Sequence, residues 1–164
     1  MFNSKILLVV FAIVAVLVIL YFTGKKSVHH EIPINAAPEK VWSVLMDTDA
    51  YDQWNPVMHL LEGKVKEGNT VKYRFTQDEE NVSEMGSKVK QIISEKLLNQ
   101  GGGMPLVITF DHKYILEPTD SGTKLTIHED YAGIYVNFWN PKPVEEAYQR
   151  LNEALKKRVE SLNQ

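Results

Sequence analysis

The feature that most constrains this chain is an unbroken run of 17 apolar residues near its start, from Ile6 to Phe22. The run is flanked by Lys5 on one side and by Lys25 and Lys26 on the other. At a rise of about 1.5 Å per residue, a helix of this length just spans the ~30 Å hydrocarbon core of a bilayer. We therefore expect a single-pass membrane anchor and short linker in residues 1–27, followed by one domain over residues 28–164.

Two alternatives to a retained anchor stay open. A secretory signal peptide has an apolar region of about 7–15 residues that ends at small residues spaced like Ala-x-Ala. Phe22, Thr23 and Gly24 do not offer such a site. A buried core helix would need a polar stripe, which this run lacks. Since lysines flank both ends, the positive-inside rule does not decide on which side of the membrane the domain lies.

Composition excludes several functions for the remaining chain. Residues 23–164 carry 17 Lys and Arg against 21 Asp and Glu, so no basic face for nucleic acid is expected. The chain has no cysteine, which excludes a disulfide, a thiolate nucleophile and a cysteine zinc site. His29 and His30 are adjacent in a predicted strand and point to opposite faces, so we predict neither a metal site nor a bound cofactor.

Hydrophobic periodicity predicts an α+β domain. The expected elements, in order, are a strand at Val28–Asn35, a helix of about ten residues from Pro38, a short helix or turn at Asp47–Pro56, a strand around Val71, Tyr73 and Phe75, a strand at Ser87–Leu98, and a helix at Pro143–Leu162. In the strand at Ser87–Leu98, Gln91 is expected on the face shared with Val89. Gly101–Gly103 is expected to form a flexible hairpin loop or a pocket lid.

The C-terminal helix is predicted from an apolar stripe at spacings of three and four residues. The stripe consists of Val144, Tyr148, Leu151, Leu155, Val159 and Leu162. The basic triplet Lys156–Arg158 near its end is expected to be solvated, with contact to anionic lipid headgroups as the alternative.

The clearest local signal is a hairpin formed by Pro105–Glu117 and Thr123–Tyr131. Matching the apolar faces of the two arms predicts a register with four opposed pairs: Leu116 with Leu125, Tyr114 with Ile127, His112 with Glu129, and Phe110 with Tyr131. A shift by one residue would turn an apolar face to water, so the pattern specifies this face assignment.

Three stretches resemble the polyketide cyclase/dehydrase and lipid transport group of the START-like superfamily. They are Ile32–Trp42 (IPINAAPEKVW), Tyr51–Pro56 (YDQWNP) and His112–Tyr131 (HKYILEPTDSGTKLTIHEDY). The resemblance implies a helix-grip fold, in which a curved antiparallel sheet wraps around the C-terminal helix and leaves an apolar cavity. It also implies a hydrophobic small molecule or lipid as the ligand. Because the group shares no catalytic motif, no catalytic residue is carried over.

Within such a cavity, the polar pair His112 and Glu129 is the main candidate for ligand contact, because directly opposed residues lie close enough to hydrogen-bond. The further candidates for the ligand site are Tyr73, Gln91, Phe110, Tyr114, Tyr131 and Trp54. Three functions stay open: a membrane-tethered binding or transfer module, a cyclase- or dehydrase-like enzyme, and an interaction domain whose cavity is filled by side chains. A void below about 300 Å³, the lower end for small-ligand sites, would favour the third.

Overall fold

The computed structural model describes residues 4–162. In this range the elements are α1 (Ser4–Thr23), β1 (Lys25–Ile34), α2 (Pro38–Met46), the 3-10 helix η1 (Thr48–Gln53), β2 (Met58–Glu62), β3 (Thr70–Thr76), β4 (Val82–Ile93), β5 (Leu97–Met104), β6 (Ile108–Thr119), β7 (Gly122–Ala132), the 3-10 helix η2 (Ile134–Asn137) and α3 (Lys142–Ser161). The first strand, α2, η1, β3, the β6–β7 hairpin and α3 follow the predicted order, whereas β2 was not predicted as a strand and the strand expected at Ser87–Leu98 is divided between β4 and β5.

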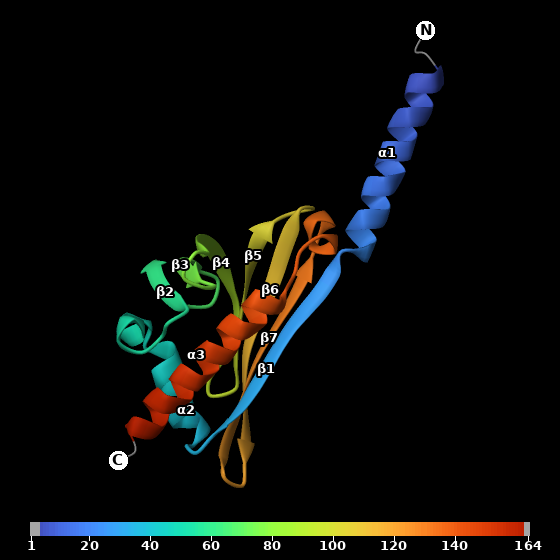
Figure 1. Cartoon of the computed structure of the whole chain (residues 1–164). Helices are drawn as coiled ribbons and strands as arrows, with labels where there is room; N and C mark the ends of the chain where they lie inside the picture. Colours follow the sequence, from blue (N-terminus) through green and yellow to red (C-terminus); the bar gives the residue numbers. More distant parts are fainter. Residues whose placement is uncertain (1–3, 163–164) are drawn as a thin grey trace.

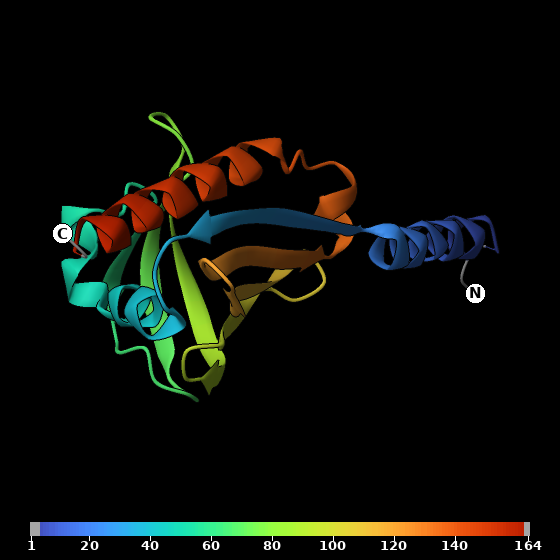
Figure 2. The same ribbon diagram turned by 90° about the horizontal axis from the view of Figure 1, so that it is seen from below.

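The strands form one seven-stranded antiparallel sheet in the order β1-β7-β6-β5-β4-β3-β2. Figure 2 shows the sheet curving beneath α3, which runs along its concave side. The helix packs most extensively on β1 and also contacts α2. The predicted α+β helix-grip arrangement is therefore confirmed.

The core lies between the concave face of the sheet and the apolar stripe of α3. Leu151 and Leu155 are fully buried, and each such side chain stabilises the fold by roughly 1.5–3 kcal/mol. The other predicted stripe residues within α3 are buried as well: Val144, Tyr148 and Val159. Leu162 is 46% exposed because α3 ends at Ser161. The stripe is thus confirmed from Val144 to Val159.

The helix α1 projects from the end of β1, and none of its residues is buried (Figure 1). It is long and apolar enough to cross a membrane. A helix of a soluble core would bury one face, which α1 does not do. Lys25–Ser27, expected in the linker, belong to β1, so that Gly24 alone separates α1 from the sheet.

The basic end of α3 lies at the end of the domain opposite α1 (Figures 1 and 2). Lys156 donates to the carbonyl of Pro33 at 2.7 Å, and Arg158 donates to Gln53 Oε1 at 3.1 Å. These cations therefore hold the C-terminal helix to neighbouring segments and lie away from any bilayer that α1 crosses. This position favours bonding within the domain over the alternative of headgroup contact.

The register of the β6–β7 hairpin is the one the sequence predicts. All four predicted pairs are opposed, including His112 with Glu129 and Phe110 with Tyr131. The turn is tighter than expected, because Thr119 already pairs with Gly122. Alternation of apolar and polar residues along both arms was sufficient to specify this register.

Two predictions around β4 and β5 are wrong. The strand expected at Ser87–Leu98 is the end of β4, a turn and the start of β5. Gly101–Gly103, expected as a loop or lid, lies within β5 and pairs with both neighbouring strands. A Cβ on Gly102 would lie 2.3 Å from the carbonyl oxygen of Gly86. Glycine is present because the backbones approach closely there, and not because the segment is flexible.

Candidate functional site

The predicted polar pair lies on the inner face of the β6–β7 hairpin and is buried, with His112 6% and Glu129 2% exposed. The distance from His112 Nδ1 to Glu129 Oε2 is 3.7 Å, which is too long for a hydrogen bond. Glu129 Oε2 instead accepts hydrogen bonds from the hydroxyls of Tyr131, at 2.6 Å, and Tyr148. The carboxylate is therefore held by two phenols, and the imidazole lies beside it.

Burial determines the ionisation of the tyrosines around this carboxylate. It raises the pKa of Tyr148 and of Tyr131, and the negative charge of Glu129 raises both further. Burial likewise raises the pKa of Tyr73 to about 12, against a small opposing effect of its hydrogen bond from Gln100. These phenols consequently stay neutral near pH 7 and act as hydrogen-bond donors.

His112 is positioned by aromatic packing. Its ring makes edge contacts with Tyr114 and Tyr148, at centroid distances of 4.6 and 5.2 Å. Its Nε2 atom is buried without a hydrogen-bond partner, and the same is true of Ser87 Oγ. A buried polar atom left unpaired costs about 1–3 kcal/mol. Such atoms are available to a polar group of a ligand or to a water molecule.

Both unpaired groups line the same internal cavity between the sheet and α3. Its lining consists of Tyr51, Met58, Tyr73, Met85, Ser87, Leu98, Gln100, Phe110, His112, Tyr114, Glu129 and Tyr148. The cavity holds only about 20 Å³, against roughly 300–1,000 Å³ for small-molecule sites. This is room for about one water molecule. The expectation of an open ligand cavity is therefore wrong for this conformation, in which side chains fill the space.

The structure brings together most, but not all, of the predicted site residues. Five of them line the cavity: Tyr73, Phe110, His112, Tyr114 and Glu129. Tyr131 lies next to it, bonded to Glu129 and packed on Trp139 at a centroid distance of 4.5 Å. Trp54 lies outside the cavity lining and packs its ring edge-on against Tyr51.

Gln91 is exposed and lies outside the cavity. The register of β4 against β5 shifts between Val89 and Gln91, and such a bulge moves the following side chains to the other face. The glutamine that lies in the cavity is Gln100, which donates to Tyr73 Oη at 3.2 Å. Sequence alternation alone does not reveal the bulge, so Gln91 was assigned to the wrong face.

Besides Gln100, sequence reasoning missed six residues of the cavity lining, and Tyr148 and Ser87 are the two of these that concern the polar site. Tyr148 was treated as part of the apolar stripe of α3, although it is the only residue of that stripe with a hydroxyl group. That hydroxyl was the signal that could have identified it as a partner for a buried carboxylate. Ser87 carried no comparable signal.

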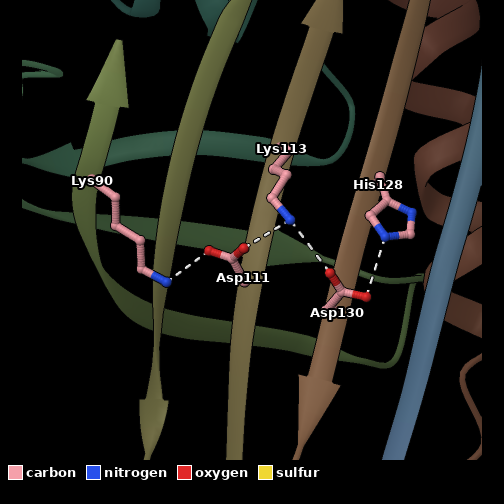
Figure 3. Close-up of polar contacts among 5 residues, drawn as sticks. All are labelled: Lys90, Asp111, Lys113, His128 and Asp130. Carbon is pink, nitrogen blue, oxygen red and sulfur yellow. Dashed lines mark hydrogen bonds and ion pairs between the residues drawn. The ribbon is translucent and has the colours of Figure 1, made fainter.

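A larger hollow, of about 790 Å³, lies on the outer face of the sheet near α1. Its lining includes the glycines Gly101–Gly103, with Lys88 and Lys90 from β4 and Asp111 from β6. Figure 3 shows how the nearby charges pair: Asp111 binds Lys90 at 2.6 Å and Lys113 at 2.9 Å. Although partial burial acts in the opposite direction, these two hydrogen bonds lower the pKa of Asp111.

The histidines His29 and His30 do not form a joint site. The ring of His29 contacts that of His128, while His30 Nδ1 lies 2.8 Å from the amide of Asn152 on α3. The two side chains thus lie on opposite faces of β1. Within residues 4–162 there is no group of three His, Cys, Asp or Glu side chains arranged to hold a metal ion.

The sequence profile described as "Polyketide cyclase / dehydrase and lipid transport" matches residues 25–160. The chain belongs to this family. The match covers the sheet and α3 and leaves out α1. No curated protein matches the sequence.

Solved structures share the fold at low sequence identity. A protein from Chromobacterium violaceum matches with a TM-score of 0.67 at 18% identity, over 82% of this chain and 97% of its own. A protein from Thermus thermophilus matches with a TM-score of 0.67 at 17% identity, over 85% and 100%. The ZhuI aromatase/cyclase from Streptomyces sp. R1128 matches with a TM-score of 0.60 at 16% identity, over 85% and 96%.

Proposed function

We propose that this member of the polyketide cyclase/dehydrase and lipid transport family is a membrane-anchored module that binds a hydrophobic small molecule or lipid between the sheet and α3. The observation that carries the proposal is the character of the cavity wall. It is mostly aromatic and apolar, and it contains one buried imidazole whose Nε2 has no partner. Ligand pockets typically combine an apolar lining with a few placed polar groups.

Binding requires the cavity to open, because about 20 Å³ cannot hold such a ligand. The lining side chains suited to move are Met58, Met85 and Phe110. Met85 and Phe110 are only partly buried, and methionine adapts its shape readily because it is unbranched and flexible. Their displacement would expose His112 Nε2 and Ser87 Oγ to a polar group of the ligand.

A second function is favoured by the cavity volume itself. A domain whose interior is filled by Tyr, Met and Phe side chains has no need of a ligand, and it would act through its surface. The same closed structure fits this alternative without any movement, so the experiment must distinguish the two.

Retention of α1 as the anchor is supported by its attachment to the domain. The side-chain amide of Asn137 donates to the carbonyl of Leu20 at 2.7 Å, and Thr23 Oγ1 donates to Asn137 Oδ1 at 2.9 Å. The carbonyl of Leu20 also accepts the backbone N–H of Gly24 at 2.9 Å, so the bond from Asn137 is a second one and ties η2 to the last turn of the helix. Cleavage after α1 as a signal peptide would remove these bonds.

The test is photocrosslinking of the full chain in phosphatidylcholine vesicles with a fatty acid that carries a diazirine. We expect crosslinked peptides from the cavity lining, especially those with Met58, Met85 or Phe110, and also from α1. Ser87→Phe places a ring in the cavity and should abolish labelling of the lining, whereas Ser121→Phe in the β6–β7 turn should not. If wild-type chain is labelled on α1 but nowhere on the lining, the filled-cavity function is correct.

A further inference from the structure

Large apolar side chains gather at the end of the domain from which α1 leaves. They come from the last residue of β5, the β5–β6 turn, and η2 with the residue after it. We call them the apolar collar: Met104, Leu106, Val107, Tyr135 and Phe138. Their exposed fractions are 62, 63, 42, 51 and 72%, in the same order. Figure 1 shows both segments beside the base of α1.

The two segments of the collar are bonded to each other. The backbone N–H of Ile134 donates to the carbonyl of Leu106 at 2.9 Å, and that of Tyr135 donates to Val107 at 3.0 Å. Hydrogen bonds of this kind fix both segments as one surface, although almost 30 residues of sequence separate them.

The collar is also continuous with α1. Besides the contacts of Asn137 with Leu20 and Thr23, the N–H of Gly133 donates to the carbonyl of Gly24 at 2.9 Å. A Cβ on Gly24 would lie 2.0 Å from the carbonyl oxygen of Gly133, so the helix and η2 are in close backbone contact. The collar therefore keeps a fixed position relative to the helix.

The chemistry of the collar fits the border between lipid tails and headgroups. Residues 104–107 and 133–139 include no charged side chain. Lys25 and Lys26 follow α1 after a single residue, Gly24, at the level where lysine meets headgroups. Leu106 has a φ of 69°, a left-handed conformation that is costly for a branched side chain. The strained turn therefore presents an exposed leucine side chain.

We propose that the apolar collar inserts into the interfacial region of the bilayer that α1 crosses, as a second membrane contact. The inference rests on the proposed anchoring by α1. Contact through both α1 and the apolar collar gives the domain one fixed orientation on the membrane. In that orientation Phe110 faces the bilayer end, because its neighbour Thr109 pairs with Ala132, which in turn pairs with Lys25. A lipid leaving the bilayer would meet this end of the cavity first.

The test uses the absence of cysteine from the chain. Leu106→Cys and Phe138→Cys are labelled with the fluorophore NBD in the full chain, with one chain in each phosphatidylcholine nanodisc. Lipids with a nitroxide on the acyl chain then quench any label at membrane depth. Ser121→Cys in the β6–β7 turn, at the far end of the domain, is the aqueous control (Figure 1). Val14→Cys in α1 reports whether the anchor is inserted.

We expect quenching at positions 106 and 138 to be at least about threefold stronger than at position 121, as for side chains inserted at the interface. If Val14→Cys is quenched while positions 106 and 138 behave like position 121, the collar does not touch lipid and the inference fails although the anchor holds. If Val14→Cys is not quenched, the anchor fails and the inference fails with it. If positions 106 and 138 become shielded only in discs that hold two chains, the collar binds a second copy, and the inference is wrong.

Discussion

The two faces of the β6–β7 hairpin hold charge in opposite ways. On the inner face, Glu129 is buried and is bound by two tyrosine hydroxyls. On the outer face, its neighbour Asp130 lies in a chain of ion pairs that includes Lys113 at 3.3 Å and His128 at 3.2 Å (Figure 3). Successive side chains on a strand point to opposite faces, so a single step along the chain separates the two environments.

The difference shows which charges the fold depends on. The outer charges are partly exposed and have solvent as an alternative partner, and such pairs contribute about 0–1 kcal/mol each. The inner carboxylate has no solvent, and its partners Tyr131 and Tyr148 would lose their acceptor if it were removed. We therefore expect the inner face to control stability and the outer face to adjust it slightly.

The largest effect is expected for Glu129→Ala. It leaves the hydroxyls of the buried Tyr148 and the partly buried Tyr131 without an acceptor and opens a small void, which should lower the free energy of unfolding by about 3 kcal/mol. The matched control is Asp130→Ala, for which we expect a loss within about 0.5 kcal/mol. Thermal unfolding of the full chain in detergent, followed by tryptophan fluorescence, measures both, because α1 contains no tryptophan.

Equal losses for the two variants would contradict the contrast between the faces. A stable Glu129→Ala protein would also reopen the enzyme hypothesis. That hypothesis expects the loss of a catalytic carboxylate to abolish turnover without much effect on unfolding.

The fold was largely predictable because it follows from periodic patterns. The β6–β7 register could be derived from where Leu116, Tyr114 and Leu125 must lie to be buried. The stripe of α3 could be derived in the same way. Both depend on the burial of many residues at once, so a single unusual position does not change the result.

The site was less predictable because it depends on single positions. The bulge between Val89 and Gln91 turns Gln91 away from the cavity, and Gln100 is the glutamine that lines it. No alternation pattern reveals this bulge. The cavity volume depends on the rotamers of Met58, Met85 and Phe110, which the sequence does not specify. Tyr148 approaches Glu129 only because α3 lies across the sheet at one particular angle, and this is a property of the packed domain.

The next largest effect is expected for an alanine at Gly102, where the inner face of the sheet is closely packed. The comparison is with an alanine at Gly86 on the outer face. Gly102 lies on the inner face, where an added Cβ would come 2.3 Å from Gly86 O and 3.0 Å from the ring of Phe110. Gly102→Ala should cost about 2 kcal/mol, because a backbone oxygen must move. Gly86→Ala, on the outer face of β4, meets no atom within 4 Å and should change stability by less than about 0.5 kcal/mol. The same unfolding measurement compares them, and similar losses would show that Gly102 is not constrained by close packing.

The smallest effect tests whether the outer charges act through screened ion pairs. Lys113→Ala removes the bridge between Asp111 and Asp130 (Figure 3) and should cost about 0.5 kcal/mol at low salt. The cost should vanish in 1 M salt, where the Debye length is about 3 Å. It should also vanish in acid. Hydrogen bonds from Lys90 and Lys113 lower the pKa of Asp111 below its ordinary 3.8, so the stabilisation is present above that value and is lost as the pH falls through the lowered pKa. A cost that persists at high salt and low pH would mean that Lys113 stabilises the sheet by packing its aliphatic stem, and the contrast between the two faces would then be one of shape as well as charge.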